Sequence, residues 1–198
     1  MPSELPRLDY RVIMELVKDN SSVLDLGCGD GELLSLLVRE RRVRGQGIEL
    51  DDQAIYQCVA KGLSVFHGDL DSGLSDYADA SFDYVIINQT LQQVRKPDVV
   101  LAEALRVGRQ VIVGFPNFAH YSARWQLAIA GKAPITAALP YQWHDTPNLH
   151  FLSISDFNHY CRERRIRVES RTHLAGERRI RLLPNLRAQS ALFVLSRS

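Results

Sequence analysis

The sequence has few cysteines, no long apolar run and almost no net charge, and each of these features excludes a class of protein. Its three cysteines, Cys28, Cys58 and Cys161, have spacings that fit neither a disulfide framework nor a zinc site. No apolar stretch approaches the roughly 20 residues that a membrane span needs, and the first nine residues lack the pattern of a signal peptide. We therefore expect a cytoplasmic protein that uses neither a membrane nor a bound metal.

The charges of the chain nearly cancel. Its 24 Lys and Arg residues face 23 Asp and Glu residues, for a net charge of +1, so no global field attracts nucleic acid. Arginine is dense in residues 39–44, 162–167 and 178–181, but glutamate interrupts or flanks each cluster. We interpret these clusters as solvated charged faces; a docking surface for an acidic partner is the alternative.

Apolar runs and helical patterns alternate along the first two thirds of the chain. Strands are predicted at residues 22–26, 45–50, 64–67, 82–88 and 110–115, and helices at 9–18, from Glu32 onward, at 51–61 and at 97–108. This alternation predicts a parallel sheet covered by helices on both faces. After a helix near residues 155–164, the runs 166–175 and 189–196 predict a closing antiparallel pair at one edge, which makes seven strands in one domain.

Residues 117–153 interrupt this pattern. The first part, to residue 131, has a helical pattern, and the rest contains Pro134, Pro140 and Pro147 without clear periodicity. Long irregular segments in compact domains are usually lids or binding segments. We therefore predict that residues 117–153 are a lid inserted into a single domain that spans residues 1–198.

The most informative motif is VLDLGCGDG at residues 23–31, a buried strand followed by three alternating glycines. Glycines at such a turn let the backbone approach a ligand closely. Glu49 lies twenty residues after Gly29, at the end of the next strand, where a carboxylate can accept hydrogen bonds from both ribose hydroxyls. The dinucleotide fingerprint does not fit, because its third glycine would fall at Glu32. The turn therefore suits a nucleoside ligand with an amino-acid tail in place of phosphates.

Further candidate residues lie where other strands end, since ligands of open α/β sheets bind beyond the carboxyl ends of strands. Asp69 can accept from an adenine amino group or can cap a turn. Asp25 is expected to hold the loop amides and meet the ligand's ammonium group. Cys28 is interpreted as a small packed residue, because no histidine stands beside it to make a thiolate. The complete set of expected ligand contacts is Asp25, Gly27, Cys28, Gly29, Glu49, Leu50, Asp69, Leu70 and Asn88.

These residues, with the strand FDYVI at 82–86, resemble the class I S-adenosylmethionine-dependent methyltransferases over residues 22–115. The chain resembles the methionine biosynthesis protein MetW family more closely and over nearly its whole length. That likeness adds residues 7–17, the loop GFPNF at 114–118 and the segment LPYQWHDTPNLH at 139–150.

The resemblance implies a Rossmann-like, mostly parallel seven-stranded sheet with an antiparallel edge strand. It also implies S-adenosylmethionine or S-adenosylhomocysteine as ligand, and a role in methionine biosynthesis beside a homoserine O-acyltransferase. A catalytic methyltransferase acting on a small molecule or lipid is the alternative. A degenerate fold with an empty pocket is a third interpretation, against which the intact turn and Glu49 weigh.

The sequence identifies no catalytic residue. The proline-containing motif of amino-group methyltransferases is replaced by INQT at residues 87–90, and Gln93 stands where a histidine is often found. His144, Asp145 and His150 have no metal-binding spacing, and a structural hydrogen bond is the favoured role of His150. Tyr141 and Trp143 are expected to cover apolar core. A group of three residues on the predicted helix can form an exposed partner face: His120, Tyr121 and Trp125.

Overall fold

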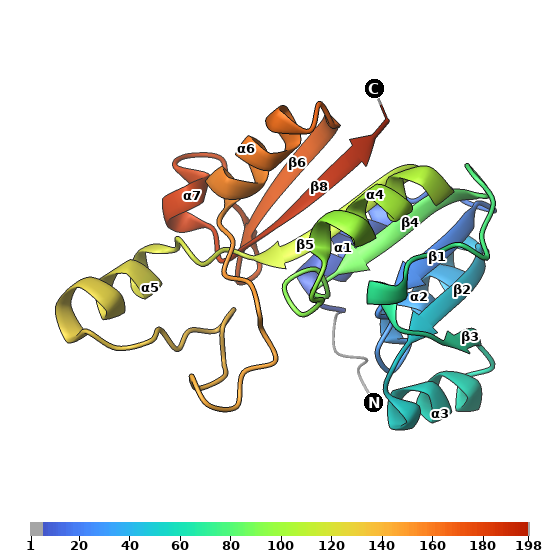
Figure 1. Ribbon diagram of the computed structural model, residues 1–198, viewed down its shortest axis with the longest axis horizontal. Helices are drawn as coiled ribbons and strands as arrows, with labels where there is room; N and C mark the ends of the chain where they lie inside the picture. Colours follow the sequence, from blue (N-terminus) through green and yellow to red (C-terminus); the bar gives the residue numbers. More distant parts are fainter. Residues whose placement is uncertain (1–5, 198) are drawn as a thin grey trace.

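A computed structural model describes residues 6–197, which form one twisted sheet with helices on both of its faces (Figure 1). The strand order within the described residues is β3-β2-β1-β4-β5-β8-β6-β7. The strands are β1 (Ser22–Leu26), β2 (Arg44–Glu49), β3 (Ser64–His67), β4 (Phe82–Asn88), β5 (Gly108–Pro116), β6 (Arg167–Ala175), β7 (Arg178–Arg179) and β8 (Ser190–Ser196). The helices are α1 (Leu8–Leu16), α2 (Glu32–Arg41), α3 (Asp52–Ala60), η1 (Leu70–Ser72), α4 (Pro97–Val107), α5 (Tyr121–Trp125), η2 (Gln126–Ala130), α6 (Ile154–Glu163) and α7 (Pro184–Arg187).

The first five strands pair in parallel, as the alternating pattern predicts. The strand order reverses between β1 and β4: β2 and β3 follow on one side of β1, and β4 and β5 on the other. A crevice for ligands forms at such a reversal, beyond the carboxyl ends of the strands. The fold therefore brings the end of β1, the end of β2 and the end of β4 to one place.

Strand β8 runs opposite to the five parallel strands, and β6 beyond it runs in their direction again. β8 pairs antiparallel with both β5 and β6, so the predicted antiparallel edge is confirmed. The seven expected strands are all present. An eighth, β7, pairs with the end of β6 through only two residues, which is too short to leave a pattern in the sequence.

The core lies on both faces of the sheet, and β4 shows why its sequence is almost continuously apolar. Val85 and Ile87 point into the core beneath α4 and α6. Tyr84 and Ile86 point into the core beneath α1 and α2. Because successive side chains of a strand face opposite ways, a central parallel strand needs apolar residues at every position.

The segment between β5 and α6 stands apart from this core. α5 and the π-helix η2 project from the body of the molecule, and an irregular chain returns from them to α6 (Figure 1). The predicted helical part at residues 117–131 is thus confirmed over residues 121–130. In residues 6–197, no helix is long and apolar enough to cross a membrane.

Candidate functional site

The site is built around the glycine turn that follows β1. Gly27 and Gly29 have positive φ angles of 73° and 56°, a conformation that favours glycine over other residues. The N–H groups of Gly27 and Cys28 both donate to the carbonyl oxygen of Ile48, which fixes the turn against the end of β2. A Cβ atom at Gly29 would meet no protein atom within 4 Å, so the turn is open on that side.

Glu49, the last residue of β2, holds the turn directly. Its Oε2 accepts a hydrogen bond from the N–H of Gly29 at 2.7 Å. Its Oε1 accepts from the N–H groups of Leu50 and Asp51, at 2.8 and 3.1 Å. Oε1 thus accepts two hydrogen bonds and Oε2 accepts one, so the free acceptor capacity of the carboxylate lies on Oε2. Glu49 therefore braces the backbone at the junction of β1 and β2, and that Glu49 accepts ribose hydroxyls stays a prediction.

Asp25 lies behind the turn with 3% of its surface exposed. Burial, and to a lesser extent the nearby charge of Glu49, raises the pKa of Asp25 to about 7. The expectation that Asp25 holds the loop amides needs correction, because the Gly29 amide is held by Glu49. Within residues 6–197, no ion pair joins the buried carboxylate of Asp25 to a cation.

Two adjoining cavities contain all nine residues that the sequence predicts as ligand contacts. The first, of about 410 Å³, is lined by Gly27, Glu49, Leu50, Asp69 and Leu70 together with residues of the 90–94 turn. The second, of about 290 Å³, is lined by Asp25, Gly27, Cys28, Gly29, Glu49 and Asn88 among others. The cavities share Gly27, Glu49, Thr90 and Gln93, so they meet at the glycine turn.

Besides Glu49, three of the nine residues have side chains with protein partners: Asp69, Asn88 and Cys28. Asp69 caps η1, since its Oδ1 accepts from the N–H of Asp71 at 2.9 Å; the capping interpretation is thus confirmed, and its second oxygen remains available. Asn88 donates through Nδ2 to Asp9 of α1. Cys28 is buried against Cys58, with their Sγ atoms 3.9 Å apart. Burial raises the pKa of Cys28, in keeping with a packed thiol and not a nucleophile.

Sequence reasoning missed the contribution of α1 and of the turn after β4. Arg7 and Tyr10 of the α1 region line the smaller cavity beside Asp25, and burial raises the pKa of Tyr10 to about 12. Thr90 packs so closely on the turn that a Cβ at Gly27 would lie 2.5 Å from it. Residues 7–17 entered the sequence analysis only through the family resemblance and Thr90 only as part of INQT, and it is their placement in the fold that brings them to the site.

Comparison with known proteins identifies the family. The family model described as "Methionine biosynthesis protein MetW" matches residues 7–195. The chain belongs to the MetW family. It is 33% identical over 211 residues to the bifunctional methionine biosynthesis protein MetXA/MetW of Rhodopirellula baltica, a match that covers all of this chain and 34% of that protein.

Other relatives place the MetW family within the methyltransferase fold. The ribosomal protein L11 methyltransferase of Burkholderia vietnamiensis is 31% identical over 107 residues, covering 53% of this chain and 35% of that one. The chain thus spans about a third of the length of both curated relatives. An S-adenosylmethionine-dependent methyltransferase from Mesorhizobium loti superposes with a TM-score of 0.71 at 14% identity, over 97% of this chain and 99% of that one. That likeness confirms the Rossmann-like class I fold.

The 117–153 segment of this MetW-family protein is tied to the site by its returning end. The N–H groups of Leu149 and His150 both donate to the carbonyl oxygen of Gln92, and the imidazole Nε2 of His150 bonds the carbonyl of Val94 at 3.0 Å. The structural role of His150 is therefore confirmed. The expectation that Trp143 and Tyr141 cover core is wrong, since their side chains are 78% and 48% exposed.

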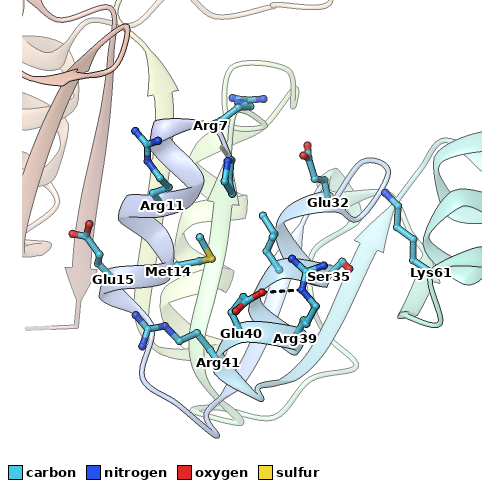
Figure 2. A pocket seen from close by; sticks show the side chains of 12 residues that line it. Arg7, Arg11, Met14, Glu15, Glu32, Ser35, Arg39, Glu40, Arg41 and Lys61 are labelled. Atoms are coloured by element: carbon cyan, nitrogen blue, oxygen red, sulfur yellow. Dashed lines mark hydrogen bonds and ion pairs between the residues drawn. The ribbon is translucent and has the colours of Figure 1, made fainter. Parts of the chain in front are cut away.

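Two further hollows border the site. One, of about 460 Å³, lies between the 117–153 segment and the end of β4, and shares Arg7, Gln89 and Gln93 with the smaller cavity. The other, of about 860 Å³, is the groove between α1 and α2 (Figure 2). Its cations are paired locally, for example Arg39 with Glu40. Apart from Arg7, none of the residues lining the two cavities at the turn also lines this groove.

Among residues 6–197, no group of three or more His, Cys, Asp or Glu side chains is arranged to hold a metal ion. His144 and Asp145 lie in the exposed part of the 117–153 segment, where Asp145 accepts from the N–H of Gln142 in a turn. The chemistry available at the site is therefore that of a carboxylate-lined, glycine-walled pocket.

Proposed function

We propose that this MetW-family protein binds S-adenosylmethionine or S-adenosylhomocysteine in the two adjoining cavities. The observation that carries the proposal is Glu49 at their junction, bonded to the open Gly29 turn. In this arrangement the ribose hydroxyls bond Glu49, and the adenine lies in the cavity beside Asp69 and between Leu50 and Leu70. The amino-acid tail enters the cavity in front of Asp25, whose carboxylate meets the ammonium group.

We further propose that the protein acts in methionine biosynthesis, in the cytoplasm, by supporting a homoserine O-acyltransferase. Membership of the MetW family supports the pathway. The partner is supported by the relative named bifunctional MetXA/MetW, which joins a region like this chain to a longer polypeptide. S-adenosylmethionine is made from methionine, so a support protein that senses this ligand would give the pathway feedback.

The 89–94 turn offers a physical route for such feedback. On one side, Thr90 and Gln93 line both ligand cavities. On the other, the carbonyl groups of Gln92 and Val94 hold the returning end of the 117–153 segment. We propose that this segment acts as a lid: a ligand that contacts the turn stabilises one arrangement of it. A ligand shifts such an equilibrium only through its differential affinity for the two arrangements.

The hollow of about 460 Å³ favours a second candidate function, methyl transfer to a small molecule or lipid. It adjoins the cavity proposed for the amino-acid tail and could admit an acceptor. No histidine or lysine lines it among residues 6–197, and its two carboxylates, Asp9 and Glu177, are ion-paired with Arg7 and Arg11. Methyl transfer to a good nucleophile needs mainly positioning, so this second function does not require a free base in the hollow.

The experiment that separates the two functions is calorimetry with S-adenosylmethionine and with S-adenosylhomocysteine, repeated in the presence of the purified acyltransferase. We expect calorimetry to show binding of both ligands. In a separate assay of the acyltransferase, we expect the rate of acyl transfer to fall when this protein is left out. Methyl transfer to an acceptor without any partner, together with unchanged acyl transfer, would establish the alternative.

A further inference from the structure

The helix formed by α5 and η2 carries an apolar stripe that faces solvent. Tyr121, Trp125 and Ile129 follow one another at four-residue spacing, and their exposed fractions are 58%, 65% and 67%. Residues four apart on a helix lie on one face. Helices of this kind normally bury their apolar stripe, so an exposed one marks an interaction site.

The stripe borders a hollow of about 570 Å³ between this helix and α7. Leu186 of α7 forms the opposite wall, and no acidic side chain lines the hollow within residues 6–197. Arg124 is part of its rim, and the exposed Arg187 follows Leu186 on α7. The surface is thus an apolar groove with a basic border, which fits an apolar element flanked by acidic residues.

The helix is held as a rigid platform for this groove. At its base, Ala123 is fully buried and His120 is nearly so, and the ring of His120 bonds the hydroxyl of Ser122 at 2.7 Å. In its middle, the side-chain amide of Gln126 donates to the carbonyl of Ile135 and accepts from the N–H of Ile135. Residues 126–130 are a π-helix, a costly conformation that is common at functional sites. These contacts fix the backbone while leaving the stripe exposed.

We propose that this groove, formed by α5, η2 and α7, is where the homoserine O-acyltransferase docks. The inference rests on the proposed function for the identity of the partner, and on the apolar stripe and basic rim for the surface. The rest of the sheet completes the fold without this helix, so the helix is an addition suited to a partner. Few residues carry most of the energy of an interface, and exposed Trp is prominent among them.

The chain offers a matched control in a second exposed apolar group on α3 and β3. Tyr56, with 74% of its surface exposed, lies there with Val59 and Phe66. Trp125→Ala and Tyr56→Ala each remove one large exposed aromatic side chain, so neither is expected to disturb the core. Circular dichroism and S-adenosylmethionine titration verify that both variants remain folded with an intact ligand site.

The test is the affinity of each variant for the purified acyltransferase, measured by calorimetry. We expect Trp125→Ala to weaken binding by at least about 30-fold and Tyr56→Ala to leave it unchanged. If the unaltered protein binds the acyltransferase and Trp125→Ala binds equally well, the groove is not the docking surface, although the proposed function stands. If the unaltered protein does not bind the acyltransferase, both proposals fail. Self-association that Trp125→Ala abolishes, with acyltransferase binding retained, would instead assign the groove to a second copy of the chain.

Discussion

The carboxylate of Glu49 and the backbone N–H of Gly29 form a hydrogen bond of 2.7 Å that joins the ends of the two strands β1 and β2. Because Gly29 lacks a side chain and its N–H is held from behind, the turn is fixed in an open form before a ligand arrives. A pocket that is ordered before the ligand binds loses less conformational entropy on binding, and the ligand therefore binds more tightly. This relationship motivates the first two predictions.

Glu49→Ala should weaken S-adenosylmethionine binding by about 1.5–3 kcal/mol, or about 10- to 150-fold, because a charge-assisted acceptor for the ribose is lost. The variant Glu49→Gln keeps one acceptor oxygen, so its affinity should lie between those of the unaltered protein and Glu49→Ala. Titration calorimetry provides the comparison. Unchanged affinity in Glu49→Ala would show that the ribose lies elsewhere.

Gly29→Val should abolish ligand binding in a protein that still folds, since the added side chain would stand in the open space of the turn. The matched control is Gly62→Val, because Gly62 also has a positive φ angle and an open Cβ direction, yet lies outside the two cavities. Both substitutions strain the backbone by about 1–3 kcal/mol. Thermal unfolding measures that shared cost. Equal loss of ligand binding in both variants would mean that strain, and not occupancy of the pocket, is the cause.

The affinity for S-adenosylmethionine should rise between pH 6 and pH 8, because Asp25 titrates near pH 7 and only its ionised form attracts the ligand's ammonium group. Asp25→Asn should bind more weakly and show no such rise.

The free energy of unfolding should behave in the opposite way. A carboxyl whose pKa is raised on folding stabilises the protein below its unfolded value, about 4, and loses that contribution as the pH rises towards 7. Urea unfolding at pH 5 and pH 8 tests this, and a stability difference that persists in Asp25→Asn would refute the assignment.

His150→Ala should loosen the returning end of the 117–153 segment without abolishing ligand binding, because its ring bonds the carbonyl of Val94. A hydrogen bond of this kind contributes about 1 kcal/mol. Hydrogen exchange at residues 148–150 should therefore quicken several-fold. His144→Ala, in the exposed part of the same segment, serves as the control and should change nothing. If His150→Ala removed ligand binding with the segment still protected, His150 would belong to the site itself.

The local sequence by itself determined the elements around the glycine turn. β1, β3 and β4 begin and end where their apolar runs predict, and Pro97 starts α4. Short strands and a proline at the first turn of a helix are marked by the residues next to them, so these elements can be recognised without the fold. The same holds for the positions of Gly29 and Glu49, which lie beside strand ends that the sequence already marks.

Only the tertiary structure decided which residues line the cavities together and which groups form hydrogen bonds with one another. It brought Arg7 and Tyr10 of α1 to the cavity beside Asp25, and it assigned the Gly29 amide to Glu49. It also left the side chain of Trp143 in solvent, although its aromatic character had suggested that it covers the core. Contacts between segments far apart in the chain depend on how whole layers pack, and a hydrogen bond forms with whichever carboxylate the packing brings within reach. Local sequence patterns do not encode such distances, so nine of the residues that line the cavities could be named from the sequence, whereas Arg7, Tyr10 and the hydrogen-bond partners could not.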